Sequence, residues 1–175
     1  TKFDKIDSLL TYLASNNKLM GSVAIQESDK VVFEKNYGYA DVKNQIKADA
    51  STRYKIGSIT KMFTSVVILQ LAEEKKLTLD TKLSKFFPSI KNSENILIEN
   101  LLEHSSGIYS FTDDADYPEY AKLPKTRAEL LKKIKAGNSV FEPGEQSAYS
   151  NSNFVLLGWI IEDLTKKTYA QNIET

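Results

Sequence analysis

The sequence predicts an α+β protein in which helices pack on an antiparallel sheet. Three observations lead to this prediction. Apolar residues recur at helical spacing in several stretches, two β-rich runs flank a tight polar turn, and 175 residues suffice for one domain with a hydrophobic core. A two-stranded hairpin is marginal alone, so either its partner strands lie outside this chain or short strands within it escape the pattern.

The first predicted elements are a helix and a hairpin. Apolar residues at helical spacing predict an amphipathic helix over residues 3–18, which Asn16 and Asn17 end. Residues 21–27 and 31–38 are rich in β-formers and enclose a short polar turn, so they predict two paired strands.

The strongest helix prediction covers residues 56–74. This stretch is apolar on most of its circumference, which is typical of a buried helix. A shorter helix is predicted over residues 96–102, and the following residues 103–107 are expected to form a loop.

Two more helices are predicted in the last third of the chain. Thr126 with Glu129 forms a capping box for a helix through Lys135, and Gly137 follows at the position of a helix C-cap. A turn over residues 141–145 precedes the last apolar helix, which is predicted from Asn153 to about Lys166.

Composition argues against several classes of function. The 23 basic and 23 acidic side chains balance, without the clustered positive patch that binds nucleic acid. Cysteine is absent and His104 alone cannot build a zinc site, so we expect no metal and no cofactor. No apolar run approaches the roughly 20 residues that span a bilayer. The N-terminus lacks the apolar stretch of a signal peptide, but a chain from which the signal peptide had been removed would lack it too.

Ser58-Ile59-Thr60-Lys61 is the first candidate catalytic motif. Residues three apart share a helix face, so the hydroxyl and the ammonium can meet. Free N–H groups at a helix start favour an oxyanion, and burial lowers the pKa of a lysine so that its amine can accept a proton. The spacing alone is not specific, because Ser15 and Lys18 share it and Ser58 could be a plain N-cap. Only Ser58 opens a long apolar helix.

Tyr149-Ser150-Asn151 is the second candidate. A phenol near a neutral lysine can carry protons, and an Asn side chain can bind a substrate amide through its donor and its acceptor. The alternative is a surface turn before the last helix. His104 precedes two serines, but no acid is placed to orient its ring, which favours a buried, hydrogen-bonded loop histidine.

Taken together, these segments resemble the serine β-lactamase-like family of class C β-lactamases, penicillin-binding D-alanyl-D-alanine carboxypeptidases and related esterases. The Ser-x-x-Lys part of the signature is shared with other penicillin-recognising enzymes. The matching stretches follow the family's order and cover nearly the whole chain: residues 37–41, 54–61, 77–80, 101–108, 141–151 and 156–162.

The resemblance assigns roles to four residues. It makes Ser58 the acylated nucleophile, Lys61 its general base and Tyr149 a partner in proton transfer, while Asn151 contacts the substrate amide. The Ser58 backbone N–H would supply half of an oxyanion hole. The loop at His104 is structural in such proteins and receives no catalytic role.

One family feature is absent. The third motif, Lys-Thr-Gly or His-x-Gly on a strand beside the site, does not occur, and Lys167-Thr168-Tyr169 follows a helix instead. The resemblance therefore implies that the chain is the N-terminal portion of a larger domain. Residues 1–57 would hold a helix and hairpin, residues 58–175 a mostly helical region with both motifs, and the C-terminal half of the same enzyme would supply the remaining strands. Alone, the fragment is expected to be a poor catalyst.

The predicted function is a serine hydrolase that forms an acyl-enzyme with D-Ala-D-Ala peptides, β-lactams or esters. A bacterial member of this family implies a periplasmic or extracellular location. The competing hypothesis is a binding or scaffold protein on the same fold, with small-molecule or peptide ligands. The complete set of Ser58, Lys61, Tyr149 and Asn151 favours the enzyme.

Overall fold

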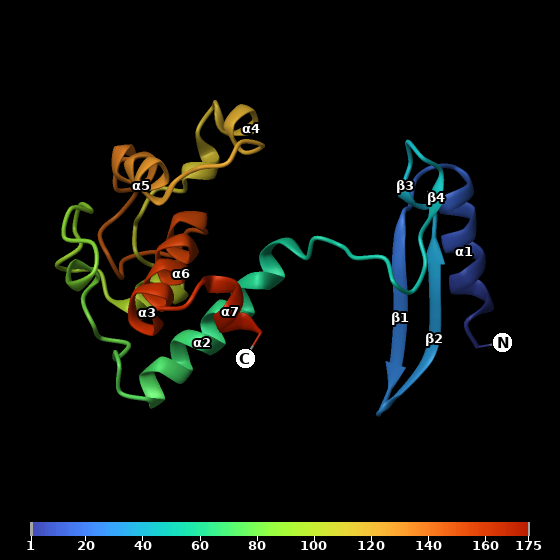
Figure 1. Ribbon diagram of the computed structural model, residues 1–175, viewed down its shortest axis with the longest axis horizontal. Helices are drawn as coiled ribbons and strands as arrows, with labels where there is room; N and C mark the ends of the chain where they lie inside the picture. Colours follow the sequence, from blue (N-terminus) through green and yellow to red (C-terminus); the bar gives the residue numbers. More distant parts are fainter. Residues whose placement is uncertain (1, 175) are drawn as a thin grey trace. The chain divides into compact units, whose positions relative to one another are not determined.

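The computed structural model describes residues 2–174, which form two compact units, residues 2–55 and 56–174. The first unit consists of α1 (Asp4–Ser15), the strand pair β1 (Gly21–Glu27) and β2 (Lys30–Tyr37), and a short second pair, β3 (Tyr39–Asp41) and β4 (Ile46–Lys47) (Figure 1). Both pairs are antiparallel. The predicted hairpin is confirmed, whereas the second pair was not predicted, because strands of two and three residues are too short to show an alternating pattern.

The long hairpin and α1 stabilise each other through a few side chains. The rings of Phe3 and Phe33 lie 5.5 Å apart, and Asp7 accepts hydrogen bonds from Lys35 and, at 3.0 Å, from the Tyr37 hydroxyl. Burial and the Asp7 carboxylate raise the pKa of Tyr37. The predicted helix over 3–18 is confirmed in shortened form, because the backbone turns left-handed at Asn17, where φ is 56°.

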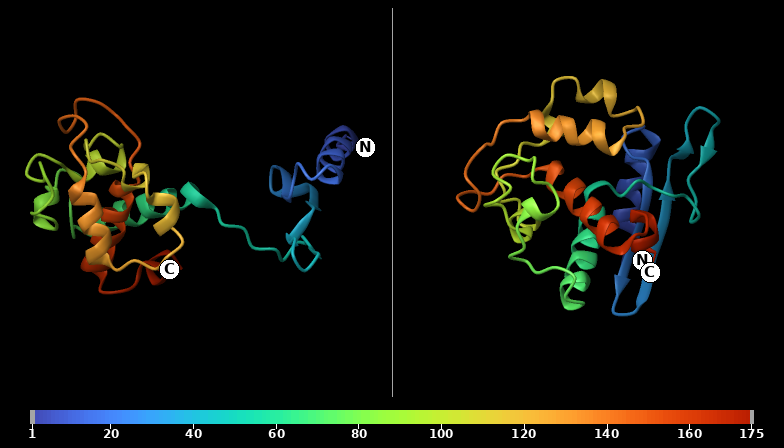
Figure 2. Two further views of the ribbon diagram at one scale, coloured as in Figure 1. Left: turned by 90° about the horizontal axis from the view of Figure 1, so that it is seen from above. Right: turned by 60° about the vertical axis from the view of Figure 1, so that its left-hand side comes forward.

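The second unit is helical. Its segments are η1 (Gly57–Ile59), α2 (Thr60–Glu73), η2 (Leu83–Lys85), α3 (Ile98–Leu102), η3 (Phe111–Asp113), α4 (Tyr117–Tyr120), α5 (Arg127–Ala136), α6 (Asn151–Thr165) and α7 (Tyr169–Ile173). The apolar helix α6 lies at the centre and contacts α2, α3 and α7 (Figure 2). Leu156, Leu157, Ile160 and Ile161 of α6 are fully buried and pack with Ile68 and Leu101 in one hydrophobic core.

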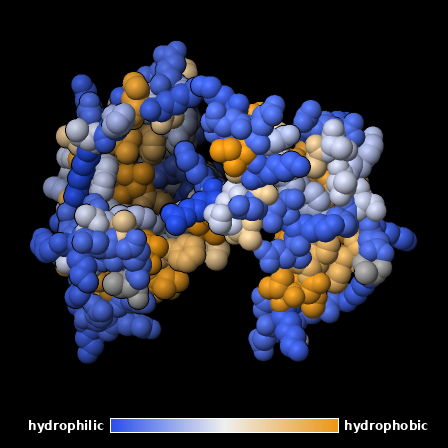
Figure 3. Space-filling view, turned by 45° about the vertical axis from the view of Figure 1, so that its right-hand side comes forward, coloured by the Kyte–Doolittle hydropathy of each residue, from blue (hydrophilic) through white to orange (hydrophobic). Residues whose placement is uncertain are grey.

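The prediction of a buried helix over residues 56–74 is correct for the helical segments η1 and α2, but wrong for the burial of one side of α2. Thr64, Val67, Ile68 and Leu71 face the core, but the opposite side of α2 is exposed over the described residues. Exposed apolar side chains on that side are Met62, Phe63, Val66 and Leu69. Within the described residues, the buried side of α2 is the one that packs in the core with α6. Apolar patches remain on the surface of both units (Figure 3).

The helix boundaries follow local capping. Thr126 and Glu129 form the predicted capping box of α5. Gly137 follows, and a Cβ there would lie 2.5 Å from the Tyr109 ring, so close packing requires the glycine. The last predicted helix begins at Asn151 instead of Asn153, because Ser150 is its N-cap. A further helix, α7, was not predicted and begins at its own capping box of Thr168 and Gln171.

Candidate active site

Ser58 and Lys61 lie where the helical part of the chain begins. Gly57, with φ at 55°, opens the short segment η1 that carries Ser58, and Lys61 lies in the first turn of α2. The Lys61 Nζ donates a hydrogen bond of 3.1 Å to the Ser58 Oγ. The three-residue spacing of the motif therefore brings the hydroxyl and the ammonium into contact.

Tyr149 reaches the same hydroxyl from the other end of the unit. It directly precedes Ser150, the N-cap of α6, and its hydroxyl lies 2.6 Å from the Ser58 Oγ. Ser58 thus has two neighbours that can exchange its proton, one from α2 and one from the segment before α6.

Asn151 is the first residue of α6 and contacts Lys61 directly. Its side-chain oxygen accepts a hydrogen bond of 2.8 Å from the Lys61 Nζ, and its Nδ2 donates to the Thr112 hydroxyl at 2.9 Å. Its backbone N–H donates to the Ser110 hydroxyl at 3.1 Å. The Asn151 amide is therefore held in one orientation, oxygen toward the lysine.

The protonated form of Lys61 interacts with the aromatic rings beside it. The Nζ lies 4.8 Å from the centre of the Tyr149 ring and 5.6 Å from that of Phe154, within the range of cation–π attraction. Desolvation works to raise the pKa of Tyr149, but its interactions with Lys61 and the Ser58 hydroxyl outweigh it, and the pKa falls below its usual range. The protonated lysine thus favours the phenolate, so Tyr149 loses its proton at a lower pH than an ordinary tyrosine.

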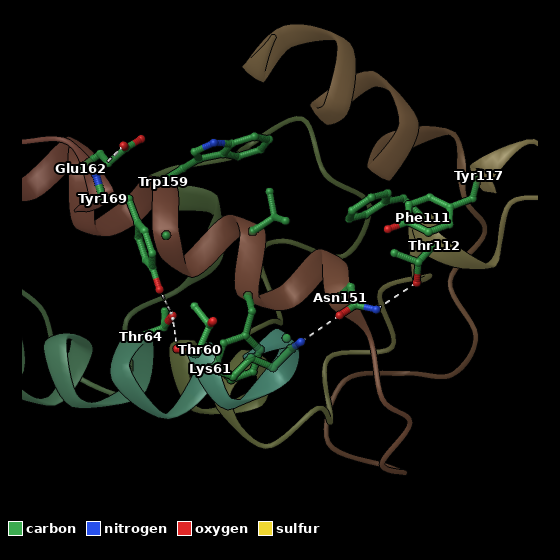
Figure 4. A pocket seen from close by; sticks show the side chains of 14 residues that line it. Thr60, Lys61, Thr64, Phe111, Thr112, Tyr117, Asn151, Trp159, Glu162 and Tyr169 are labelled. Carbon is green, nitrogen blue, oxygen red and sulfur yellow. Dashed lines mark hydrogen bonds between the residues drawn. The ribbon is translucent and has the colours of Figure 1, made fainter. Parts of the chain in front are cut away.

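A pocket of about 450 Å³ adjoins these residues. Figure 4 shows it along one face of α6, with Lys61 and Asn151 on one side, Tyr169 and Glu162 at one end, and Phe111, Thr112 and Tyr117 at the other. At the end that carries Tyr169, the Thr64 and Tyr169 hydroxyls share a hydrogen bond of 2.7 Å. Five aromatic side chains are among its lining residues, and they suit an apolar group close to the nucleophile.

The other motifs considered in the sequence make structural hydrogen bonds away from Ser58. Ser15 donates to the carbonyl of Tyr12 at the end of α1, in the first unit. Thr168, from the Lys-Thr pair near the C-terminus, caps α7. Ser105 and Ser106, which follow His104, hydrogen-bond to Asn100 and Asn153.

Ser110 and Thr112 were missed by the sequence analysis. They orient Asn151 from the start of η3, about 40 positions earlier in the chain. No local pattern marks them, because their role arises only when this segment packs against the start of α6.

Two negative findings concern the described residues. Within residues 2–174, no group of three His, Cys, Asp or Glu side chains is arranged to hold a metal ion. Over the same residues no helix has the length and apolarity required to cross a bilayer.

Comparison with protein families matches residues 11–175 to the family described as Beta-lactamase. The teichoic acid D-alanine hydrolase of Staphylococcus aureus is 33% identical over 174 residues, which are 99% of this chain and 41% of that protein.

Two solved structures are similar in fold. A penicillin-binding protein homologue from Pyrococcus abyssi, an octamer, has a TM-score of 0.84 and 31% identity over 99% of this chain and 42% of its own. A D-stereospecific amidohydrolase from Streptomyces has a TM-score of 0.79 and 30% identity, covering 95% of this chain and 51% of its own. The predicted α+β class is confirmed, and the chain spans about half or less of each relative.

Proposed function

Because the chain belongs to the Beta-lactamase family, we propose that the protein carrying it is a serine hydrolase that works through an acyl-enzyme on Ser58. The observation that carries the proposal is the contact of one hydroxyl with two proton-exchanging groups. The Ser58 Oγ lies 3.1 Å from the Lys61 Nζ and 2.6 Å from the Tyr149 hydroxyl. A serine is a weak nucleophile until such neighbours take its proton.

The proposed reaction has two halves. In the first, the Ser58 Oγ bonds to the substrate carbonyl carbon, and its proton passes to the unprotonated amine of Lys61 as general base. The bond to the leaving group then breaks as Tyr149 gives its hydroxyl proton to that group and regains one from the Lys61 ammonium. In the second, water adds to the acyl-serine, the acid is released and the proton returns to Ser58.

The Ser58 backbone N–H supports charge stabilisation in this scheme. The first backbone hydrogen bond of the helical segment runs from the Ile59 N–H to the Ile56 carbonyl. The Ser58 N–H precedes it and is available to an oxyanion at the positive end of the helix dipole. We propose that the second N–H, the third motif and the remaining strands come from the C-terminal half of the same enzyme.

The proposed substrates are acyl compounds of D-alanine, as esters or amides, with β-lactams as acylating analogues. The names of relatives support this choice, since one is a teichoic acid D-alanine hydrolase and another a D-stereospecific amidohydrolase. In the proposed complex Asn151, oriented by Thr112, contacts the substrate amide. Such substrates belong to the cell envelope, so we place the protein outside the cytoplasmic membrane, in the periplasm or extracellular space.

The test measures hydrolysis of matched D-alanyl and L-alanyl esters by the protein carrying this sequence. A second measurement, the intact mass after incubation with benzylpenicillin, detects a covalent adduct. We expect release of D-alanine at a rate well above that of the L-enantiomer, and one penicilloyl group per chain. Binding of the D-alanyl ester without release of alanine would instead support a non-catalytic binding protein.

A further inference from the structure

We propose that His104 is a positioning residue, whose neutral imidazole holds Tyr149 and the start of α6 in place beside Ser58 and releases them when the ring is protonated. The inference rests on the proposed function, because it assigns a role in setting up the acylation of Ser58. Its evidence is independent of the nucleophile and lies in the contacts of the imidazole.

The imidazole contacts the second motif in two ways. Its Nδ1 accepts a hydrogen bond of 3.1 Å from the Ser150 N–H and lies 3.4 Å from the Asn153 Nδ2. Its ring lies against that of Tyr149, with centroids 4.5 Å apart and planes inclined by 36°. The side chain of His104 thus contacts the residues on both sides of the bond between Tyr149 and Ser150.

The loop that carries His104 is itself joined to the segment before α6. The His104 carbonyl accepts from the Ala148 N–H at 2.9 Å, and the Ser105 carbonyl accepts from the Gly144 N–H at 2.8 Å. The Glu103 carbonyl accepts from the Ser147 hydroxyl at 3.2 Å. Because the backbone is fixed by these bonds, the imidazole has a defined place from which to orient the tyrosine.

The role requires one protonation state. A ring nitrogen accepts a hydrogen bond only when it carries no proton, so the Ser150 N–H requires the tautomer with its proton on Nε2. Burial, followed by the nearby charge of Lys61, lowers the pKa of His104, which keeps the ring neutral at neutral pH. A proton on Nδ1 would place two hydrogen-bond donors, the imidazole N–H and the Ser150 N–H, against each other. It would also add the imidazolium to Lys61 as a second cation beside the Tyr149 ring.

The charged and titratable groups around the imidazole are few. Lys61 faces it from α2 and Tyr149 from the segment before α6. Its neighbours on α6, Asn153 and Phe154, carry no charge, and the Phe154 ring lies 5.2 Å from the imidazole. Protonation of His104 therefore has no carboxylate among these neighbours to compensate it.

Two substitutions separate the hydrogen bond from the ring. In His104→Asn the side-chain oxygen occupies the place of Nδ1 and still accepts, but it does not titrate, and asparagine tolerates the left-handed φ of 59° found here. In His104→Phe the ring remains and the acceptor is lost, which leaves the Ser150 N–H unpaired. Circular dichroism of both variants monitors folding at each pH.

The first measurement is the rate of Ser58 labelling by a fluorophosphonate between pH 8 and 5. We expect His104→Asn to label within about fivefold of the wild-type rate at pH 8, and His104→Phe at least tenfold more slowly. The labelling rate of the wild type divided by that of His104→Asn should stay constant above pH 7 and fall at least threefold by pH 5. The reason is that only the wild type loses its hydrogen-bond acceptor, when the imidazole is protonated. A constant ratio throughout, or wild-type rates in His104→Phe, would overturn the proposal.

The second measurement keeps the proposal testable if Ser58 is not labelled. Imidazole ¹⁵N shifts identify the tautomer, and comparison with His104→Asn assigns the resonance. We expect a proton on Nε2, a bare Nδ1 at neutral pH, and a Ser150 amide that shifts with the titration of the ring. If Ser58 is not labelled but the spectrum is as expected, only the proposed hydrolase function is refuted. A proton on Nδ1 at neutral pH would refute the positioning role of His104.

Discussion

The Ser58 Oγ and the Tyr149 hydroxyl lie 2.6 Å apart, although 91 positions separate them in the chain. The contact exists because α2 and α6 pack side by side with their N-terminal ends together. Lys61 and Asn151, one from each helix, hydrogen-bond across the same junction at 2.8 Å. The candidate site is thus formed by the meeting of two helix starts.

Loss of the Lys61 amine should nearly stop acylation. Lys61→Ala removes the proposed general base and the hydrogen bond to the Ser58 Oγ. We expect the labelling rate at neutral pH to fall by about 10² to 10⁴. Lys18→Ala, in the other Ser-x-x-Lys match, is the matched control and should leave the rate unchanged. A loss below about tenfold in Lys61→Ala would mean that another group takes the proton.

Removal of the Tyr149 hydroxyl should slow acylation while the ring stays in place. Tyr149→Phe keeps the packing on His104 and loses the contact to Ser58. The pKa of Tyr149 is lowered, so its phenolate forms at lower pH than that of an ordinary tyrosine. We expect a fall of about 10²-fold in rate, measured by stopped-flow acylation, and loss of any rise in rate that follows the phenolate below pH 10. Equal pH profiles in the variant and the wild type would argue against a proton-transfer role.

Gly107 should be essential for folding of the loop that supports the second motif. Its φ is 70°, and a Cβ would lie 2.0 Å from the Phe141 carbonyl oxygen. We expect Gly107→Ala to lower the free energy of unfolding by at least about 3 kcal/mol, measured by urea denaturation. Gly144→Ala is the control, since its φ is 85° but nothing lies within 4 Å of the added Cβ. It should cost about 1 to 2 kcal/mol, and equal costs at both positions would refute the steric argument.

The ion pair between α5 and α6 should make stability depend on pH in the acid range. Arg127 binds both carboxylate oxygens of Asp163 at 2.7 and 2.6 Å, and this hydrogen bonding, partly opposed by burial, lowers the pKa of Asp163. A lowered pKa contributes stability above about pH 3.9, the unfolded value, and this contribution is lost as the pH falls through the folded value. Both side chains are about 40% exposed, so Asp163→Asn should cost only about 0.5 to 1 kcal/mol at pH 7. Thermal denaturation between pH 7 and 3 measures this, and an unchanged slope in the variant would contradict it.

Sequence patterns that span only a few residues predicted the local structure well. The capping box of Thr126, the hairpin, and the Ser-x-x-Lys spacing all depend on neighbours in the chain, and the structure contains each of them. The exposure of one side of α2 could not be predicted from the residues of α2, because it depends on which elements pack against the helix.

The roles of two residues at the site could not be predicted, because they depend on tertiary contacts. Nothing near Thr112 indicates that it orients Asn151, and nothing near His104 indicates that its Nδ1 receives the Ser150 N–H. Both contacts join an earlier part of the chain to the start of α6, whose Leu156 and Leu157 belong to the hydrophobic core.

The most direct test of the account is the intact mass of the protein carrying this sequence after reaction with a fluorophosphonate. In this reaction the Ser58 oxygen bonds to phosphorus, fluoride leaves, and the hydroxyl proton passes to Lys61. We predict one adduct per chain, mapped by peptide sequencing to Ser58, and none in Ser58→Ala, which should unfold at the same urea concentration. An adduct retained in Ser58→Ala, or mapped to another serine, would contradict the assignment of Ser58 as the nucleophile.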